Sequence, residues 1–212
     1  MIGNKKQKKM ALHCFSLFAL MLIITGIPLF YPNRNLLISH GLFYPFLFIL
    51  EFMIIVPLYF YRFKKLPGFG LGNFSFSQLI VYSIAILCIQ LGYPFLLGQD
   101  KLIGMSNQPQ LFPRYVYWLT QLTLIFMVPL YEEISFRGGL FSALQIWIKN
   151  PYFASCVTSI TFSLLHTQYT DINSMVILFF ISLILVSARR KTNGLLLPIT
   201  LHMLMNSAAV LV

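Results

Sequence analysis

Two adjacent glutamates and an arginine lie within one of the most apolar stretches of this chain. Glu132, Glu133 and Arg137 stand between the apolar runs 122–130 and 140–148. Ionisable side chains at membrane depth are costly, and their presence indicates a functional site. Residues four apart share a helix face, so Arg137 can pair with Glu133 while Glu132 points elsewhere. One carboxylate is then structural, and the other is free for chemistry.

Two histidines and an asparagine lie in apolar segments further along the chain. His166 ends the run 160–166, and His202 and Asn206 are four residues apart in the last segment. That spacing places His202 and Asn206 on one helix face. In a folded bundle, Glu132 and these three residues can converge from three different helices. Together such groups can activate a water molecule and hold a developing negative charge.

Each of these residues also has a structural interpretation. A single intramembrane histidine such as His166 is more often a hydrogen-bonded packing residue, and Asn206 can be a contact between helices. Glu133 with Arg137 can be a purely structural pair. Glu51, the carboxylate of another apolar segment, belongs to no motif, and we interpret it as a satisfied core residue. The convergence of four polar residues favours a functional site over these alternatives.

The composition of the chain is that of an integral membrane protein. Of its 212 residues, 58% are hydrophobic and only 9% are charged, whereas soluble domains average roughly 25% charged residues. The net charge of +10 is compatible with a nucleic-acid partner, but the basic residues form short clusters between apolar runs. That distribution is typical of the loops that fix membrane topology. We therefore expect the lipid bilayer, and no nucleic acid, as a partner.

The pattern of apolar segments predicts an all-α, polytopic membrane helix bundle. With about 20 apolar residues for each span, the chain has seven candidate transmembrane helices: 10–31, 42–61, 78–98, 115–147, 152–169, 174–188 and 195–212. A cytoplasmic N-terminus places twelve of the 15 lysines and arginines in cytoplasmic segments. This bias supports a cytoplasmic N-terminus and an external C-terminus.

The three motifs together resemble those of a known family. Residues 132–138 match EExxFRG, residues 162–166 match FxxxH, and residues 202–206 match HxxxN. In this order, on successive membrane helices, they resemble the CAAX prenyl endopeptidase and bacteriocin-processing (CPBP, or Abi) family. The resemblance covers residues 115 to 210. We divide the chain accordingly into residues 1–114, with the first three helices, and residues 115–212, with the helices that carry the motifs.

The resemblance implies an intramembrane endopeptidase, a hydrolase similar to CAAX proteases. It implies that the catalytic residues are Glu132, His166, His202 and Asn206, and that Glu133 and Arg137 support them. The implied substrate is a membrane-anchored peptide or protein. The reaction would serve the maturation of a bacteriocin or signalling peptide, self-immunity, or CAAX-type processing. The short, lysine-rich chain is typical of a multi-pass protein of a bacterial plasma membrane.

Peptide hydrolysis needs an activated water molecule and a stabilised oxyanion. We predict that Glu132 is the general base, that His166 orients the water, and that His202 and Asn206 donate hydrogen bonds to the oxyanion. Glu132, His166 and His202 are also the residue types of a three-ligand Zn²⁺ site. The HExxH spacing of helix-borne zinc proteases is absent, and the metal-free mechanism is slightly preferred.

Two further expectations concern the setting of the site. Helix lengths place Glu132 and His202 in the cytoplasmic half of the membrane, so we expect a site that opens to the cytoplasm. The alternative to an enzyme is a non-catalytic membrane scaffold or immunity protein, in which the motif residues only hold helices together.

Overall fold

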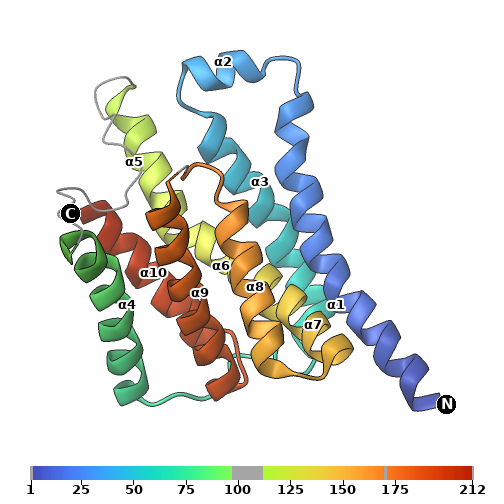
Figure 1. The fold of residues 1–212 in the computed structure, drawn as a ribbon. Helices are drawn as coiled ribbons and strands as arrows, with labels where there is room; N and C mark the ends of the chain where they lie inside the picture. Colours follow the sequence, from blue (N-terminus) through green and yellow to red (C-terminus); the bar gives the residue numbers. More distant parts are fainter. Residues whose placement is uncertain (1, 97–111, 170, 212) are drawn as a thin grey trace.

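A computed structural model describes residues 2–96, 112–169 and 171–211 of the chain. Within these ranges every regular element is helical and no strand occurs (Figure 1). The all-α class predicted from the sequence is therefore confirmed. Each predicted apolar segment is helical over most of its described length.

The first part of the chain forms three long helices and one short one. Their bounds are α1 (Ile2–Gly26) with the 3₁₀ turn η1 (Ile27–Phe30), α2 (Arg34–Ser39), α3 (Phe43–Leu58) with the π-helical segment η2 (Tyr59–Phe63), and α4 (Phe76–Leu96). A helical stretch then runs from residue 114 to residue 148 as α5 (Arg114–Leu122), η3 (Thr123–Met127), α6 (Val128–Glu133), η4 (Ile134–Leu140) and α7 (Phe141–Ile148). The last helices are α8 (Pro151–Leu165), α9 (Ile172–Thr192) and α10 (Leu196–Leu211).

Several of these helices are apolar enough for a membrane. Among the described residues, three have the length and composition to cross it: Lys5–Phe30, Phe43–Phe63 and Ile172–Thr192. Three shorter apolar helices accompany them: Phe76–Gly92, Pro151–Leu165 and Leu196–Val210. The protein is thus a helical membrane protein, while seven spans and a cytoplasmic N-terminus stay predictions.

The connections between the helices divide the bundle into two ends. Figure 1 shows the N-terminus at the same end as the connections after η2, after α7 and after α9. These connections hold basic clusters at residues 62–65, 149 and 189–191, and we call this the basic end. Helix α2, the start of α5, the α8–α9 connection and the end of α10 lie at the opposite end (Figure 1).

Two π-helical segments flank α6, the short helix that carries both motif glutamates. Pro129 lies in the first turn of α6, and proline in a continuous helix removes a backbone hydrogen bond and crowds the preceding turn. The π-helical segment η3 directly precedes this turn, and such segments are frequent at functional sites. The helix therefore changes its winding on both sides of Glu132 and Glu133.

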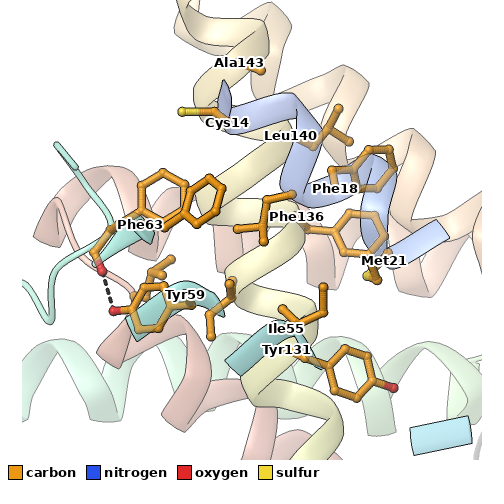
Figure 2. Close-up of a cluster of buried hydrophobic side chains, with 14 of the residues drawn as sticks. Cys14, Phe18, Met21, Ile55, Tyr59, Phe63, Tyr131, Phe136, Leu140 and Ala143 are labelled. Atoms are coloured by element: carbon orange, nitrogen blue, oxygen red, sulfur yellow. Dashed lines mark hydrogen bonds between the residues drawn. The ribbon is translucent and has the colours of Figure 1, made fainter. Parts of the chain in front are cut away.

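The largest hydrophobic core lies where α1 and α3 meet the 114–148 stretch (Figure 2). Its members include Phe18 from α1, Ile55 from α3 and Phe136 from η4. The rings of Phe18 and Phe136 meet edge to face with 5.2 Å between their centroids. The N-terminal helices thus support the segment that carries the EExxFRG motif.

Gly138 allows the closest approach in this core. A methyl group built on Gly138 would lie 2.6 Å from Cε1 of Phe69, a ring that is fully buried. We expect Gly138→Ala to lower the free energy of unfolding by about 1–3 kcal/mol, the usual cost of overpacking, although alanine is the better helix former. Thermal unfolding in detergent measures this.

The matched control is Gly26→Ala at the end of α1, where the added methyl would have no neighbour within 4 Å. We expect this variant to unfold at the wild-type temperature or slightly above. Equal unfolding temperatures for the two variants would contradict the packing argument.

Candidate active site

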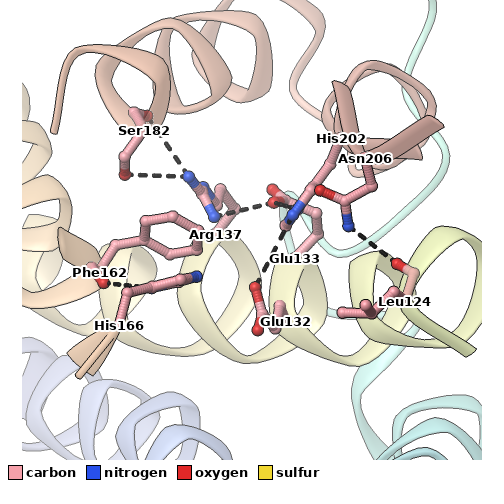
Figure 3. A network of polar contacts seen from close by, with 9 residues as sticks. All are labelled: Leu124, Glu132, Glu133, Arg137, Phe162, His166, Ser182, His202 and Asn206. Atoms are coloured by element: carbon pink, nitrogen blue, oxygen red, sulfur yellow. Dashed lines mark hydrogen bonds and ion pairs between the residues drawn. The ribbon is translucent and has the colours of Figure 1, made fainter. Parts of the chain in front are cut away.

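The predicted pair between Glu133 and Arg137 is present and fully buried. Nη1 of Arg137 lies 2.8 Å from Oε1 of Glu133, and neither side chain is exposed. Nη2 of Arg137 donates to Oγ of Ser182 in α9 at 3.0 Å. The guanidinium also lies over the ring of Phe162 from α8, 4.6 Å from its centroid. Arg137 therefore ties its own helix to α8 and α9 (Figure 3).

His202 joins this pair from α10. Its Nδ1 lies 2.8 Å from the same Oε1 of Glu133 that Arg137 contacts. A carboxylate paired with arginine can only accept hydrogen bonds, so the hydrogen is on Nδ1 of His202. Nε2 of His202 then faces Glu132, whose Oε2 lies 3.9 Å away (Figure 3). Glu133 is thus the common partner of Arg137 and His202, a contact that helix spacing alone does not predict.

Glu132 has a different environment from its neighbour. Its side chain is 15% exposed, and its Oε2 is buried without a hydrogen-bond partner. Glu133 in contrast is fully buried and accepts from two cationic or N–H donors through Oε1. Oε2 of each glutamate lacks a hydrogen-bond partner. The two carboxylates therefore differ in their contacts and exposure: Glu133 is bound within the helix bundle, whereas Glu132 is partly exposed.

His166 and Asn206 are each held by a backbone carbonyl. Nδ1 of His166 lies 2.7 Å from the carbonyl of Phe162 in α8. Because a carbonyl only accepts, the hydrogen of a neutral His166 is on Nδ1 and its Nε2 keeps a lone pair. Nδ2 of Asn206 donates to the carbonyl of Leu124 at 2.8 Å, which leaves its second amide hydrogen free. These contacts fix the orientation of both side chains (Figure 3).

One cavity brings the four predicted catalytic residues together. It has a volume of about 140 Å³, and Glu132, His166, His202 and Asn206 all line it. The remaining wall is mainly apolar or aromatic and includes Leu124 and Leu178. The convergence of these residues from separate helices is therefore present in the fold, whereas their catalytic roles stay predictions.

A second cavity, of about 340 Å³, shares two of these four residues with the first. It is also lined by Glu51, which belongs to no motif. Glu132 and His166 line it together with Glu51 from α3. Glu51 accepts a hydrogen bond from Oγ1 of Thr25 and is only 4% exposed. It is a satisfied carboxylate, as interpreted, but it also faces the candidate site. In the sequence, Glu51 is recognisable only as a carboxylate in an apolar segment. That pattern does not predict that it lies beside Glu132 and His166.

Both cavities lie toward the end of the bundle opposite the basic end. Tyr117 near the start of α5 and Val210 near the end of α10 line the first cavity, and Gln168 from the α8–α9 connection lines both. The expectation of a site that opens toward the basic loops is therefore wrong. Helix lengths give the depth of single residues in the membrane. The direction in which the cavities extend depends on how α1 packs against η4, which helix lengths do not predict.

The donor set does not form a metal site in this arrangement. Within residues 2–96, 112–169 and 171–211, no three His, Cys, Asp or Glu side chains gather closely enough to hold a metal ion. Nδ1 of His202 is bonded to Glu133 and Nδ1 of His166 to the Phe162 carbonyl, a pattern that metal-ligating histidines also show, so only the spacing of the donors disfavours a metal here. We therefore derive no chemical step through a metal.

Comparison with known proteins agrees with the site geometry. Residues 114–208 match the family described as Type II CAAX prenyl endopeptidase Rce1-like. The match covers less than half of the chain, and this C-terminal region is similar to that family. The matched region begins at α5 and contains every motif residue of the candidate site.

One similar protein has a description that names no function. A protein of Escherichia coli described as an uncharacterized 24.3 kDa protein is 38% identical over 88 residues. The match spans 40% of this chain and 40% of the relative's length. No solved structure matches the chain significantly.

The buried pair gives a prediction for stability. Arg137→Gln leaves Glu133 as a buried carboxylate without its cation, and we expect the free energy of unfolding to fall by about 3–5 kcal/mol. Ser182→Ala removes one hydrogen bond to the charged guanidinium, for which we expect a smaller loss of about 1.5–3 kcal/mol. Thermal unfolding in detergent ranks the variants.

The control is the double variant Glu133→Gln/Arg137→Gln, which removes both charges at once. It should be more stable than Arg137→Gln alone, because no buried charge is left without a partner. A double variant that unfolds at or below the temperature of Arg137→Gln would show that the pair is not the source of the effect.

Proposed function

We propose that this protein is an intramembrane endopeptidase that cleaves membrane-associated peptides with a water molecule activated by Glu132. The observation that carries the proposal is that Glu132 lines one cavity together with His166, His202 and Asn206, with an Oε2 that accepts no hydrogen bond. The neighbouring carboxylate, Glu133, lines neither cavity and binds Arg137 and His202 through Oε1. A carboxylate that the fold leaves facing a cavity at membrane depth is best explained by a reaction.

In the proposed reaction, the water molecule lies between Oε2 of Glu132 and Nε2 of His166. Glu132 removes a proton from the water as its oxygen attacks the carbonyl carbon of the peptide bond. The lone pair on Nε2 of His166 accepts a hydrogen bond from the other hydrogen of the water and thereby orients it. Glu132 then gives its proton to the leaving amine, so that the products are a carboxylic acid and an amine.

The developing oxyanion needs hydrogen-bond donors. The free amide hydrogen of Asn206 is one donor, since the other is bonded to the Leu124 carbonyl. Nε2 of His202 is the second donor when the ring is doubly protonated, because Nδ1 already carries the hydrogen shared with Glu133. Arg137 and Ser182 take no direct part and keep Glu133, and through it His202, in position.

The substrate class that fits is a peptide that is anchored in or inserted into the membrane. The cavities are lined mainly by apolar and aromatic side chains, with Phe48 shared by both. Maturation of a bacteriocin or signalling peptide, self-immunity and CAAX-type processing all offer such a substrate. We place the protein as a multi-pass protein in a bacterial plasma membrane.

The alternative is a non-catalytic scaffold or immunity protein. The contacts of Glu133, Arg137 and Asn206 suit that role, because each is bonded to another part of the bundle. A scaffold gives no reason for a carboxylate, Glu132, that lines a cavity together with two histidines. The two functions therefore differ in what the loss of this one carboxylate does.

Glu132→Gln separates the two functions. If Glu132 is the general base, the variant should lose at least about a hundredfold in cleavage rate, the lower range for acid–base catalysis. The measurement uses purified protein in nanodiscs with a library of membrane-anchored precursor peptides. Wild-type cleavage rates in Glu132→Gln would rule out the proposed role.

A matched control is available in Asp171→Asn, the same acid-to-amide change outside the site. Asp171 caps α9 by accepting from the backbone N–H of Ser174, and asparagine is an equally good N-cap. This variant should retain both cleavage and stability. If it loses cleavage together with Glu132→Gln, the loss reflects general sensitivity to such changes rather than catalysis by Glu132.

Metal removal tests the metal-free version of the mechanism. Protein dialysed against a strong chelator should cleave at the same rate as untreated protein, because the proposed water is activated by Glu132 alone. Loss of cleavage that added Zn²⁺ restores would overturn the metal-free version and would leave the requirement for Glu132 in place.

A further inference from the structure

The candidate site is closed on the side of the basic end. Directly beyond Glu133, all seven residues of η4 are buried. An added methyl on Gly138 would lie 2.6 Å from a ring carbon of Phe69, and one on Gly139 would lie 3.0 Å from the backbone oxygen of Cys14. Side chains and backbone of α1, η4 and the loop after η2 thus fill this region. Among the described residues, the motif is therefore tightly packed on the side of the basic end.

The cavities instead extend to the ends of the helices on the opposite side. The first runs from Glu132 past Gln121 to Tyr117, which is one turn from the start of α5. The second includes Tyr44 in the first turn of α3 and Gln168 beyond the end of α8. Gln168 lines both cavities and is exposed. The mouth of the site is therefore at the end opposite the basic end.

The two ends differ strongly in charge. At the basic end, the exposed residues include Arg62, Lys64, Lys65, Lys149 and Lys191. At the opposite end, among the described residues, only Arg34 and Arg114 carry a positive charge, and Lys101 lies outside the described residues. Segments rich in lysine and arginine stay in the cytoplasm when a helical membrane protein inserts. The charge pattern thus assigns the basic end to the cytoplasm.

Exposed aromatic side chains mark both ends as membrane interfaces. Tyrosine and tryptophan are enriched at the level of the lipid headgroups. Those at the opposite end are Tyr31, Tyr44, Tyr115 and Trp118, and those at the basic end are Tyr61, Trp147 and Tyr152. Tyr44 and the neighbouring Tyr117 belong to the cavity walls, so the mouth lies at headgroup level.

We propose that the candidate catalytic cavity opens to the extracytoplasmic face of the membrane, and that its substrate is a peptide presented from that side. The substrate part rests on the proposed function, whereas the side of access does not. This access suits a peptide that is exported, or one that enters the membrane from outside. It disfavours processing of a prenylated protein at the cytoplasmic face.

Cysteine labelling tests the side of access without any need for activity. In a background in which Cys14, Cys88 and Cys156 are replaced by alanine, a single cysteine is introduced as Gln168→Cys at the mouth or as Lys64→Cys at the basic end. Both positions are exposed. Whole cells with a permeable outer envelope are treated with a membrane-impermeant maleimide, before and after the plasma membrane is opened.

We expect Gln168→Cys to react in intact cells and Lys64→Cys to react only after the membrane is opened. A Gln168→Cys that reacts only after opening overturns the proposal. A Lys64→Cys that reacts in intact cells also overturns it, because the basic end would then face outward. Thermal unfolding of both variants at the temperature of their cysteine-free parent verifies that the labelled proteins are folded.

A second experiment tests where the substrate enters. The wild-type protein is prepared in sealed right-side-out and inside-out membrane vesicles, and a peptide cleaved in nanodiscs is added outside, with a polar tag that prevents crossing. Cleavage confined to right-side-out vesicles is expected. Cleavage confined to inside-out vesicles overturns the side of access and leaves the endopeptidase in place. If no peptide is cleaved even in nanodiscs, the proposed function fails, and the labelling result still decides the side of access.

Discussion

The buried ion pair between Arg137 and Glu133 is the interaction on which the rest of the site depends. Both side chains are fully buried at a separation of 2.8 Å, and a buried charge is tolerated only when it is paired and hydrogen-bonded. His202 and Ser182 complete the arrangement from α10 and α9. One charge pair thus joins three helices and positions an imidazole beside Glu132.

Part of this arrangement follows from the sequence because it is local. The spacing of four between Glu133 and Arg137 predicts their pairing, and the same spacing puts His202 and Asn206 on one cavity wall. The helical class follows from long apolar segments. These features depend on residues close together in the chain, where helix geometry fixes the outcome.

Other features could not be predicted because they depend on how distant helices pack. Ser182 is one of several serines in apolar helices, and nothing in its neighbours marks it as a partner of Arg137. The bond between His202 and Glu133 joins residues 69 positions apart. The closed side of the site depends on Gly138 and Gly139 approaching Phe69 and α1. Depth along single helices therefore gave the wrong opening.

The division of the chain between family core and N-terminal helices has a functional meaning. The family match covers residues 114–208, and this region supplies the four residues of the proposed chemistry. Helices α1 and α3, outside the match, supply Thr25, Phe48 and Glu51 to the second cavity. In the proposed function, the matched region thus supplies the chemistry, and the N-terminal helices supply part of the surface that the proposed substrate would meet.

The most direct test of this account compares the two adjacent glutamates in one experiment. Glu132→Gln and Glu133→Gln are purified side by side, and thermal unfolding and peptide cleavage are measured on each. The account predicts that Glu132→Gln unfolds at the wild-type temperature but cleaves no peptide, and that Glu133→Gln unfolds at a lower temperature because Arg137 loses its buried partner. An unstable Glu132→Gln beside a stable Glu133→Gln would contradict it.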